Sequence, residues 1–263
     1  MSQSRSIAII AAIVAVVVVG GYVVYDQVLR GDSVGALELP SAAPSPTSGP
    51  AASAAGGDTS AAPASSAPAS SATTGSAASF DGSVAGTWNA TTGSQAGYRV
   101  REQLANLPAE SDAVGRTSDV AGSITITTSG STSTLTAGDI TVDTTTIKSD
   151  RDMRDNRMRQ EGLQTDVYKT ATFKVTAPVA IPAAALAGTA SNVTLTGDLT
   201  LHGVTKSVSI PAKAQFQDGK IQVAGSLAFP LSDYSITAPN VGGFVLSVED
   251  HGTLEFLVIF AKA

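Results

Sequence analysis

The side chains that could carry out catalysis or bind a metal are few and scattered along the chain. There are two histidines and no cysteine, which excludes disulfides, thiolate zinc sites and cysteine nucleophiles. His202 precedes Gly203 at the end of an alternating segment, and His251 lies in the polar stretch VEDHGT before the last apolar segment. We interpret both as turn residues in preference to general bases, because the pattern gives neither a nucleophile nor an orienting partner.

The sequence also lacks the motifs of common enzyme classes. No Gly-x-Ser-x-Gly elbow, phosphate loop, dinucleotide fingerprint or His-Glu-x-x-His motif occurs. Carboxylates lie scattered at the ends of apolar segments and are not paired. We therefore predict that the protein is not an enzyme and has no catalytic residue, metal ligand or cofactor.

One charged segment, Lys148–Glu161, interrupts the apolar patterns of the second half of the chain. It carries five cations and four anions and predicts a short helix with Met153 on its inner face. Two interpretations stay open. The helix is either a solvated surface element or a flap over the mouth of a barrel, where Arg151 or Arg154 would face the polar head of a ligand.

The elements that must position any binding residues are predicted from hydropathy with a period of two. In Val193–Leu201, apolar side chains alternate with threonines and an aspartate, which is the pattern of a strand with one buried face. Ile221–Phe229 and roughly Thr253–Ala261 repeat the pattern, and Asp218-Gly219 is a hairpin signal. We predict an all-β domain of roughly seven to nine antiparallel strands, which either close into a barrel or fold into a two-sheet sandwich.

The first part of the chain differs in composition from the rest. Ile7–Val24 contains no charged side chain, and its 18 residues would span roughly 27 Å as a helix, close to the hydrocarbon thickness of a bilayer. We predict a transmembrane signal anchor over residues 1–30, in preference to a cleaved signal peptide. A disordered Ala/Ser/Pro-rich linker over 31–79 and a folded domain over 80–263 follow. This order predicts a single-pass protein of the cell membrane with an extracytoplasmic domain.

The net charge of the chain limits the classes of partner that we expect it to bind. A formal net charge of −6 is mild and gives no basic footprint for nucleic acid. The predicted partners are the cell membrane, through the N-terminal helix, and a ligand of the folded domain. The sequence leaves a homodimer open.

Four stretches of the folded domain resemble, in order and spacing, the motifs of the YceI-like family. They are ITVDTTTIKSDRDMRDNRMR, VYKTATFKVT, GDLTLHGVTKSVSIPAKAQ and FPLSDYSITAP. The resemblance covers roughly Gly86 to Lys262. The chain departs from the family pattern at Tyr168-Lys169, where an aromatic-Pro pair is usual, and at Ser235, where glycine is usual.

The resemblance implies a lipocalin-like, closed antiparallel barrel of about eight strands with one short charged helix and an elongated cavity for a polyisoprenoid chain. The apolar alternating faces agree with such a cavity, but they would also suit a filled core. Candidates for contacting a polar ligand head are Tyr98, Arg99, Arg151 and Arg154. Candidates for the cavity wall are Phe173, Leu195, Leu199, Val223, Phe229, Phe244 and Phe256.

The predicted function is therefore that of a membrane-tethered binding protein that holds an apolar isoprenoid or lipid-like ligand inside its barrel. The alternative is a filled β-sandwich at the cell surface, which would bind protein or glycan through its loops and hold no internal ligand. A cavity in the folded domain would favour the first interpretation, and a filled core would favour the second.

Overall fold

The computed structural model describes residues 34–40, 83–104, 110–238 and 245–263. The predicted transmembrane anchor, most of the predicted linker and Phe244 lie outside these ranges. None of the helices within the ranges has the length and apolar composition that a bilayer-spanning helix needs.

A single antiparallel sheet of eleven strands accounts for most of the described chain. Its strands are β1 Gly86–Ala90, β2 Gln95–Leu104, β3 Ser111–Thr117, β4 Val120–Ser129, β5 Thr132–Asp143, β6 Thr170–Val175, β7 Val179–Ile181, β8 Ser191–Leu201, β9 Val204–Gln217, β10 Lys220–Pro230 and β11 Val245–Lys262. The count exceeds the predicted one because β2 and β3 extend the sheet beyond β11, and the short β7 pairs with β5.

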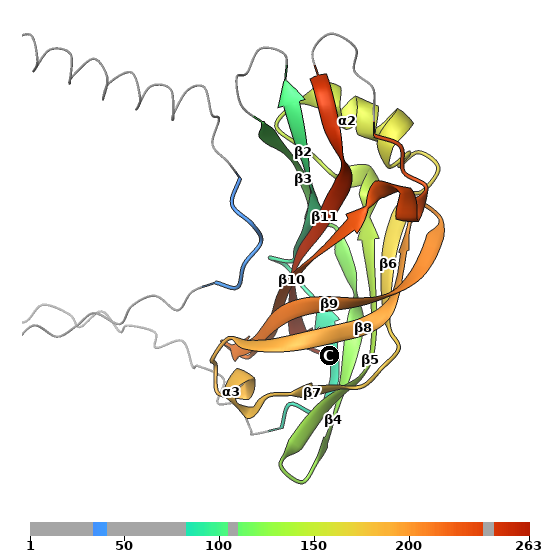
Figure 1. The fold of residues 1–263 in the computed structure, drawn as a ribbon. Helices are drawn as coiled ribbons and strands as arrows, with labels where there is room; N and C mark the ends of the chain where they lie inside the picture. The colour runs from blue at the N-terminus through green and yellow to red at the C-terminus, as the bar shows by residue number, and fades with distance from the viewer. Residues whose placement is uncertain (1–33, 41–82, 105–109, 239–244) are drawn as a thin grey trace, which may run out of the picture.

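Eight of these strands close into a ring. They pair in the order β1-β4-β5-β6-β8-β9-β10-β11, and β11 pairs in turn with β1 (Figure 1). Trp88 in β1 illustrates the closure, because it pairs with Lys262 in β11 on one side and with Ile124 in β4 on the other. The predicted closed barrel is confirmed, and the two-sheet sandwich is excluded as the fold.

The two turns that join β8, β9 and β10 follow the sequence signals. His202 and Gly203 have φ angles of 51° and 74°, and Asp218 and Gly219 have φ angles of 53° and 71°. Two successive residues with positive φ are typical of the type I′ turn, whose twist matches that of the strands it joins. These turns fix the register of three long strands, so their apolar faces point to the interior together.

The last strand is longer than the sequence predicts. The stretch VEDHGT, interpreted as a turn, lies inside β11, and the register with β2 shifts between Val248 and Gly252. The turn interpretation of His251 is therefore wrong. A β-bulge places extra residues in one strand without ending it, and its polar side chains point to solvent. The Asp-His-Gly signal marks this irregularity and not a chain reversal.

The described helices are short, and the charged segment forms two of them. They are η2 Thr144–Thr146, α2 Asp152–Arg157, η3 Met158–Gly162, α3 Ala183–Leu186 and η4 Leu231–Tyr234. Asp155 is buried and accepts hydrogen bonds from the backbone N–H and the hydroxyl of Ser149, at 2.9 and 2.7 Å. Met158, three residues later, shares this inner face and packs on the core. Met153, predicted for the inner face, is 66% exposed but borders the larger cavity beneath the helix.

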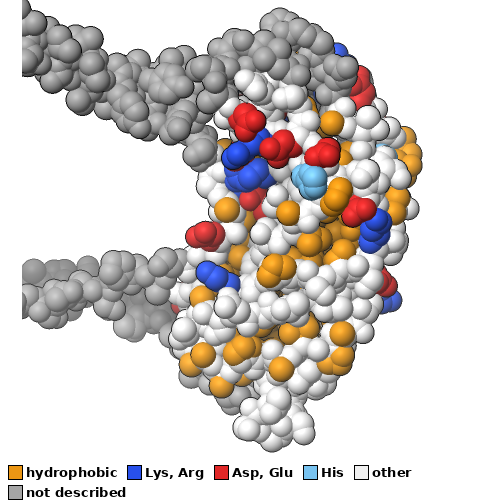
Figure 2. All heavy atoms as spheres, in the orientation of Figure 1, with side chains coloured by type: hydrophobic (Ala, Val, Ile, Leu, Met, Phe, Trp, Pro, Cys, Tyr) orange, Lys and Arg blue, Asp and Glu red, His pale blue; other side chains and the backbone are white. Residues whose placement is uncertain are grey.

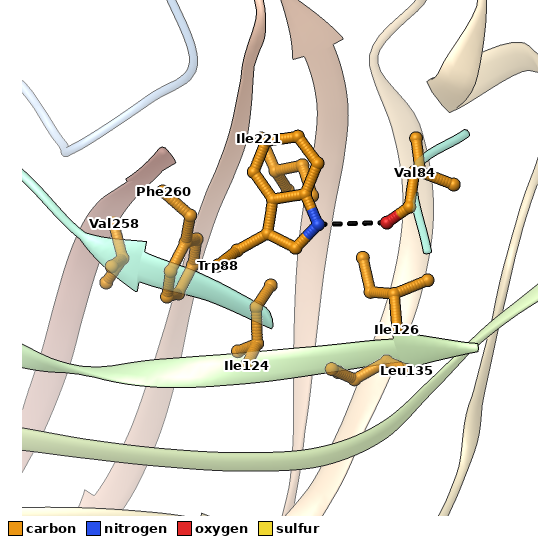
Figure 3. Close-up of a cluster of buried hydrophobic side chains, with 8 residues drawn as sticks. All are labelled: Val84, Trp88, Ile124, Ile126, Leu135, Ile221, Val258 and Phe260. Atoms are coloured by element: carbon orange, nitrogen blue, oxygen red, sulfur yellow. Dashed lines mark hydrogen bonds between the residues drawn. The ribbon is translucent and has the colours of Figure 1, made fainter. Parts of the chain in front are cut away.

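Two apolar clusters lie along the interior of the barrel. The first surrounds Trp88, which is 1% exposed and donates a hydrogen bond from Nε1 to the carbonyl oxygen of Val84 at 2.9 Å (Figure 3). The second surrounds Tyr234 in η4, whose ring packs edge-on against that of Phe229. Both clusters supply wall residues to the candidate site.

Candidate functional site

The barrel interior contains two chambers, with volumes of about 220 and 110 Å³. The larger, lined by Met158 and Leu163 of the helical segment and by Phe229 and Leu231 of the second cluster, is called the capped chamber. The smaller, lined by Ile124 and Phe260 of the first cluster, is called the apolar chamber. They share four wall residues, which are Ala96, Val142, Ala171 and Leu254. The two chambers therefore form one elongated interior, near the lower end of the roughly 300–1,000 Å³ usual for small-molecule pockets.

The wall of the apolar chamber offers almost no polar chemistry. Thr172 is the one lining residue whose side chain carries a polar atom. Five of the predicted wall residues line this chamber, and they are Phe173, Leu195, Leu199, Val223 and Phe256. A chamber of this composition can favour an occupant only by removing apolar surface from water and by fitting its shape.

Two of its aromatic rings have room because they lie against glycines. A Cβ on Gly197 would lie 2.7 Å from the ring of Phe173, and a Cβ on Gly225 would lie 2.8 Å from the ring of Phe256. Both distances are shorter than van der Waals contact, and backbone oxygens of Lys174 and Pro211 lie as close or closer, so a larger residue at either glycine would displace a ring or the neighbouring strand.

The capped chamber combines an apolar wall with a few polar groups beneath α2. Tyr98 and Glu102 project into it from β2, and Arg151, Arg154 and Arg157 border it from the helical segment. The hydroxyl of Tyr98 is buried and has no hydrogen-bond partner. Burial raises the pKa of Tyr98 well above its usual value of 10.0, so the hydroxyl keeps its proton and remains a donor at neutral pH.

Each of the three arginines has a carboxylate partner. Arg154, whose side chain is 13% exposed, forms ion pairs with Glu102 and with Asp150. Burial acts to lower the pKa of Arg154, but the nearby Glu102 carboxylate raises it overall, so the guanidinium stays charged. Arg151 and Arg157 pair in the same way with Asp150 and Glu161. The chamber wall therefore contains the Tyr98 hydroxyl, a buried donor without a partner, beside arginines that are paired with carboxylates. Among the described residues, no group of three or more His, Cys, Asp or Glu side chains is placed to hold a metal ion.

The structure brings most of the predicted site residues together around this interior. Tyr98, Arg151, Arg154 and Phe229 line the capped chamber, next to the five predicted residues of the apolar chamber. Arg99 does not join them. It points to the outside of the barrel, where it pairs with Asp112 at 3.0 Å, because neighbouring residues of a strand point to opposite faces. Arg99 is therefore dropped from the predicted head-group contacts.

Sequence reasoning missed the residues that complete the capped chamber. Glu102 is the most important of these, because it neutralises Arg154 from a different element. A signal was available, since Tyr98, Val100 and Glu102 alternate along β2 and all line the chamber. The other missed residues, Met158, Leu163 and Ile236, come from irregular segments whose inner faces have no simple period.

Comparison with known proteins places this interior in a family. The model of the YceI-like domain matches residues 69–260, which is more than half of the chain. The chain belongs to the YceI-like family. No curated protein matches it.

One solved structure shares the fold of this YceI-like domain at low sequence identity, and two others are similar to it at lower scores. A polyisoprenoid-binding domain from Saccharophagus degradans, implicated in plant cell wall breakdown, is 21% identical with a TM-score of 0.52, covering 67% of this chain and 98% of that one. The BcnA protein of Burkholderia cenocepacia is 18% identical with a TM-score of 0.47, over 63% and 95% of the two chains. The YceI protein of Campylobacter jejuni is 19% identical with a TM-score of 0.41, over 57% and 85%.

Proposed function

We propose that the protein is a binding protein that holds an isoprenoid-like chain inside its barrel. The apolar part of the ligand would lie in the apolar chamber, and its polar end would lie in the capped chamber. The observation that carries this proposal is the pair of joined chambers, one lined by aliphatic and aromatic groups and the other including the unpartnered Tyr98 hydroxyl in its wall. The polyisoprenoid-binding domain of Saccharophagus degradans, which has the same fold, supports it.

The apolar wall would supply most of the affinity. Removing apolar surface from water contributes about 25 cal/mol per Å², so a stretch of ten methylenes would gain on the order of 8 kcal/mol before the costs of ordering it. Aliphatic and aromatic side chains such as Leu195, Leu199 and Phe256 form no directional hydrogen bonds with the isoprenoid. The apolar chamber would therefore select length and branching.

The polar end of the ligand would be a hydrogen-bond acceptor of little charge. Tyr98 offers a proton donor that no protein group accepts. The positive charge of Arg154 is already compensated by Glu102 and Asp150. A phosphate would need uncompensated cations around it, whereas a hydroxyl, ether or carbonyl oxygen would need only the Tyr98 hydroxyl. The proposal therefore favours a neutral, oxygen-containing head and includes no catalytic step.

We also propose that the N-terminal segment tethers the domain to the cell membrane on its extracytoplasmic side. The support is the uncharged run Ile7–Val24, which is long enough to span a bilayer as a helix. A single-pass anchor would keep the barrel close to a reservoir of apolar ligands. It would also explain how a protein could exchange compounds that are almost insoluble in water.

Native mass spectrometry of the full chain, purified gently from its source membrane, would test the binding function. We expect a stoichiometric apolar adduct that is released on denaturation and identified after organic extraction. A bare mass that also fails to take up a C40 isoprenoid alcohol would contradict the proposal. That outcome would favour the alternative of a surface display module.

A further inference from the structure

A short segment ahead of the domain lies on the outside of the barrel. The residues of Val34–Pro40, of sequence VGALELP, form no helix or strand and run alongside the barrel wall (Figure 1). Arg99 donates a hydrogen bond to the carbonyl oxygen of the first residue at 2.7 Å, and Arg116 donates one to that of the second. Nε2 of Gln215 lies 3.2 Å from the carbonyl oxygen of the last residue, and its two hydrogens are shared among this oxygen and the side-chain oxygens of Gln217 and Gln222 at 3.0 and 2.8 Å. The wall therefore binds both ends of the segment through its main chain.

The side chains of the segment alternate as they would on a sheet surface. Leu37 and Leu39 are half-buried, whereas Val34, Ala36 and Glu38 are exposed. This period of two places both leucines on one side of an extended chain. The segment therefore has an inner apolar face in addition to its carbonyl contacts.

The wall beneath the segment contains buried polar groups that point away from the chambers. Glu255, only 2% exposed, accepts from Arg116 at 2.6 Å and lies 3.5 Å from Arg99. Gln215 and Gln222 are also buried, and Nε2 of Gln215 donates to the side-chain oxygen of Gln222 at 2.8 Å. Figure 2 shows charged side chains gathered over this upper part of the wall, around β2 and β3. Outward polar groups of a barrel usually face water, whereas these groups are buried with the segment in place.

We propose that Val34–Pro40 is a strap that fixes the chain to the outer wall of its own barrel ahead of the low-complexity linker. The linker then begins and ends on the domain, at Pro40 and Ser83, and its length does not set how far the domain stands from whatever precedes the strap. If Ile7–Val24 spans the membrane as proposed, the connection of nine residues from 25 to 33 reaches at most about 30 Å. This consequence rests on the proposed tether, whereas the docking of the strap does not.

A distance measurement in the full chain tests the docking. The protein has no cysteine, so spin labels can be attached at Glu38→Cys and Ser207→Cys, both exposed positions, on the strap and on β9. We expect a single narrow distance distribution. Leu37→Asp should abolish the narrow peak, and the matched variant Ala36→Asp, at an exposed position, should preserve it. A broad distribution in the parent protein, or the same distribution in both variants, would overturn the proposal.

A second experiment tests the spacing. Energy transfer from a dye on Ser207→Cys to a dye in phosphatidylcholine vesicles should not change when a second copy of residues 41–79 is inserted into the linker. In the Leu37→Asp background the same insertion should reduce the transfer. A reduction in the parent protein would refute a spacing set by the strap. A full chain that does not insert into vesicles would instead refute the proposed tether, and the distance distribution would still decide the docking.

Discussion

The two chambers of the barrel are formed by the same kind of strands but differ in what they can recognise. The apolar chamber is enclosed almost entirely by strands, and Thr172 alone among its lining residues has a polar side chain. Part of the wall of the capped chamber is formed by α2 and η3, and these elements place Arg154 in an ion pair with Glu102. The regular strands thus provide volume, whereas the irregular helical segment provides polarity. If this division is correct, substitutions in the two chambers should change different properties of binding.

The largest effect is expected where charge enters the apolar chamber. Leu199 is 3% exposed, and Leu199→Asp would place a carboxylate where no partner or water can compensate it. We expect the free energy of unfolding to fall by at least about 4 kcal/mol, or the domain not to fold. Chemical denaturation measures this change. Thr194→Asp, at an exposed position of the same strand, should cost little, and an equal loss in both variants would contradict the assignment of faces.

A smaller loss is expected when the ion pair of the capped chamber is broken. Arg154→Met leaves the buried Glu102 without its main partner and should lower the free energy of unfolding by about 3 kcal/mol. Adding Glu102→Gln should recover most of this loss, because the uncompensated charge is then gone. Denaturation of the two single variants and the double variant measures the coupling. Strictly additive losses would show that the pair does not act as a unit.

Tyr98→Phe should distinguish the contributions of the two chambers to binding most clearly. It removes a buried hydroxyl that has no partner, so the empty domain should gain about 1 kcal/mol of stability. Affinity for a long isoprenoid alcohol should fall about five- to tenfold, because the head loses its donor. Affinity for squalene, a hydrocarbon without a head, should not change. Titration with both compounds measures the difference, and an equal fall for both would contradict a head site at Tyr98.

The same tyrosine predicts how stability depends on alkaline pH. Because burial raises the pKa of Tyr98 in the folded state, its contribution to stability is fully present below the usual pKa of 10.0 and is lost as the pH rises beyond it. Unfolding free energies measured from pH 8 to 11 should therefore decline above about pH 10, by on the order of 1 kcal/mol at pH 11. The Tyr98→Phe variant should decline less. Identical slopes in the two proteins would contradict the burial of this hydroxyl.

Filling the apolar chamber should change the selectivity for ligand length more than the stability. Leu195→Phe adds volume to its wall and should alter the free energy of unfolding by less than about 1.5 kcal/mol, because the cavity can accept part of the ring. It should weaken binding of a C40 isoprenoid alcohol more than that of a C15 alcohol with the same head. Tyr98→Phe should weaken both alike. Competition titrations with alcohols of different chain lengths measure these affinities. An equal loss for the C40 and C15 alcohols in Leu195→Phe would contradict the prediction.

The sequence predicts the regular part of this molecule well. Alternation is strict in Val193–Leu201 and approximate in Ile221–Phe229, and both turns consist of residues that tolerate positive φ, so strand, face and register follow from local chemistry. The closed barrel was predicted through the family resemblance, because alternation alone suited a sandwich equally well. Closure depends on the pairing of β1 with β11, which lie at opposite ends of the domain, and no local pattern records that contact.

The polar part of the site was less accessible to sequence reasoning. Arg154 meets Glu102 across 52 positions of the chain, and Arg116 meets Glu255 across 139. Which residues form such ion pairs depends on strand register and on the path of an irregular segment. Assigning both Tyr98 and Arg99 to one ligand ignored that strand neighbours point to opposite faces. The contact of Val34–Pro40 with the wall was missed because this segment was assigned to the predicted linker on the basis of its composition.

The pairing of β1 with β11 also determines when the interior can exist during synthesis. β1 leaves the ribosome among the first strands of the domain and must wait for almost all the others before its partner in the ring is made. Until then the faces that will line both chambers are open along a seam, and closing that seam is a contact of long sequence separation, which is slow to form. An apolar compound present at that moment could be enclosed as the wall forms, without passing α2. Refolding the emptied domain with and without a C40 isoprenoid alcohol would reveal whether the ligand is acquired during closure or only afterwards through the mouth.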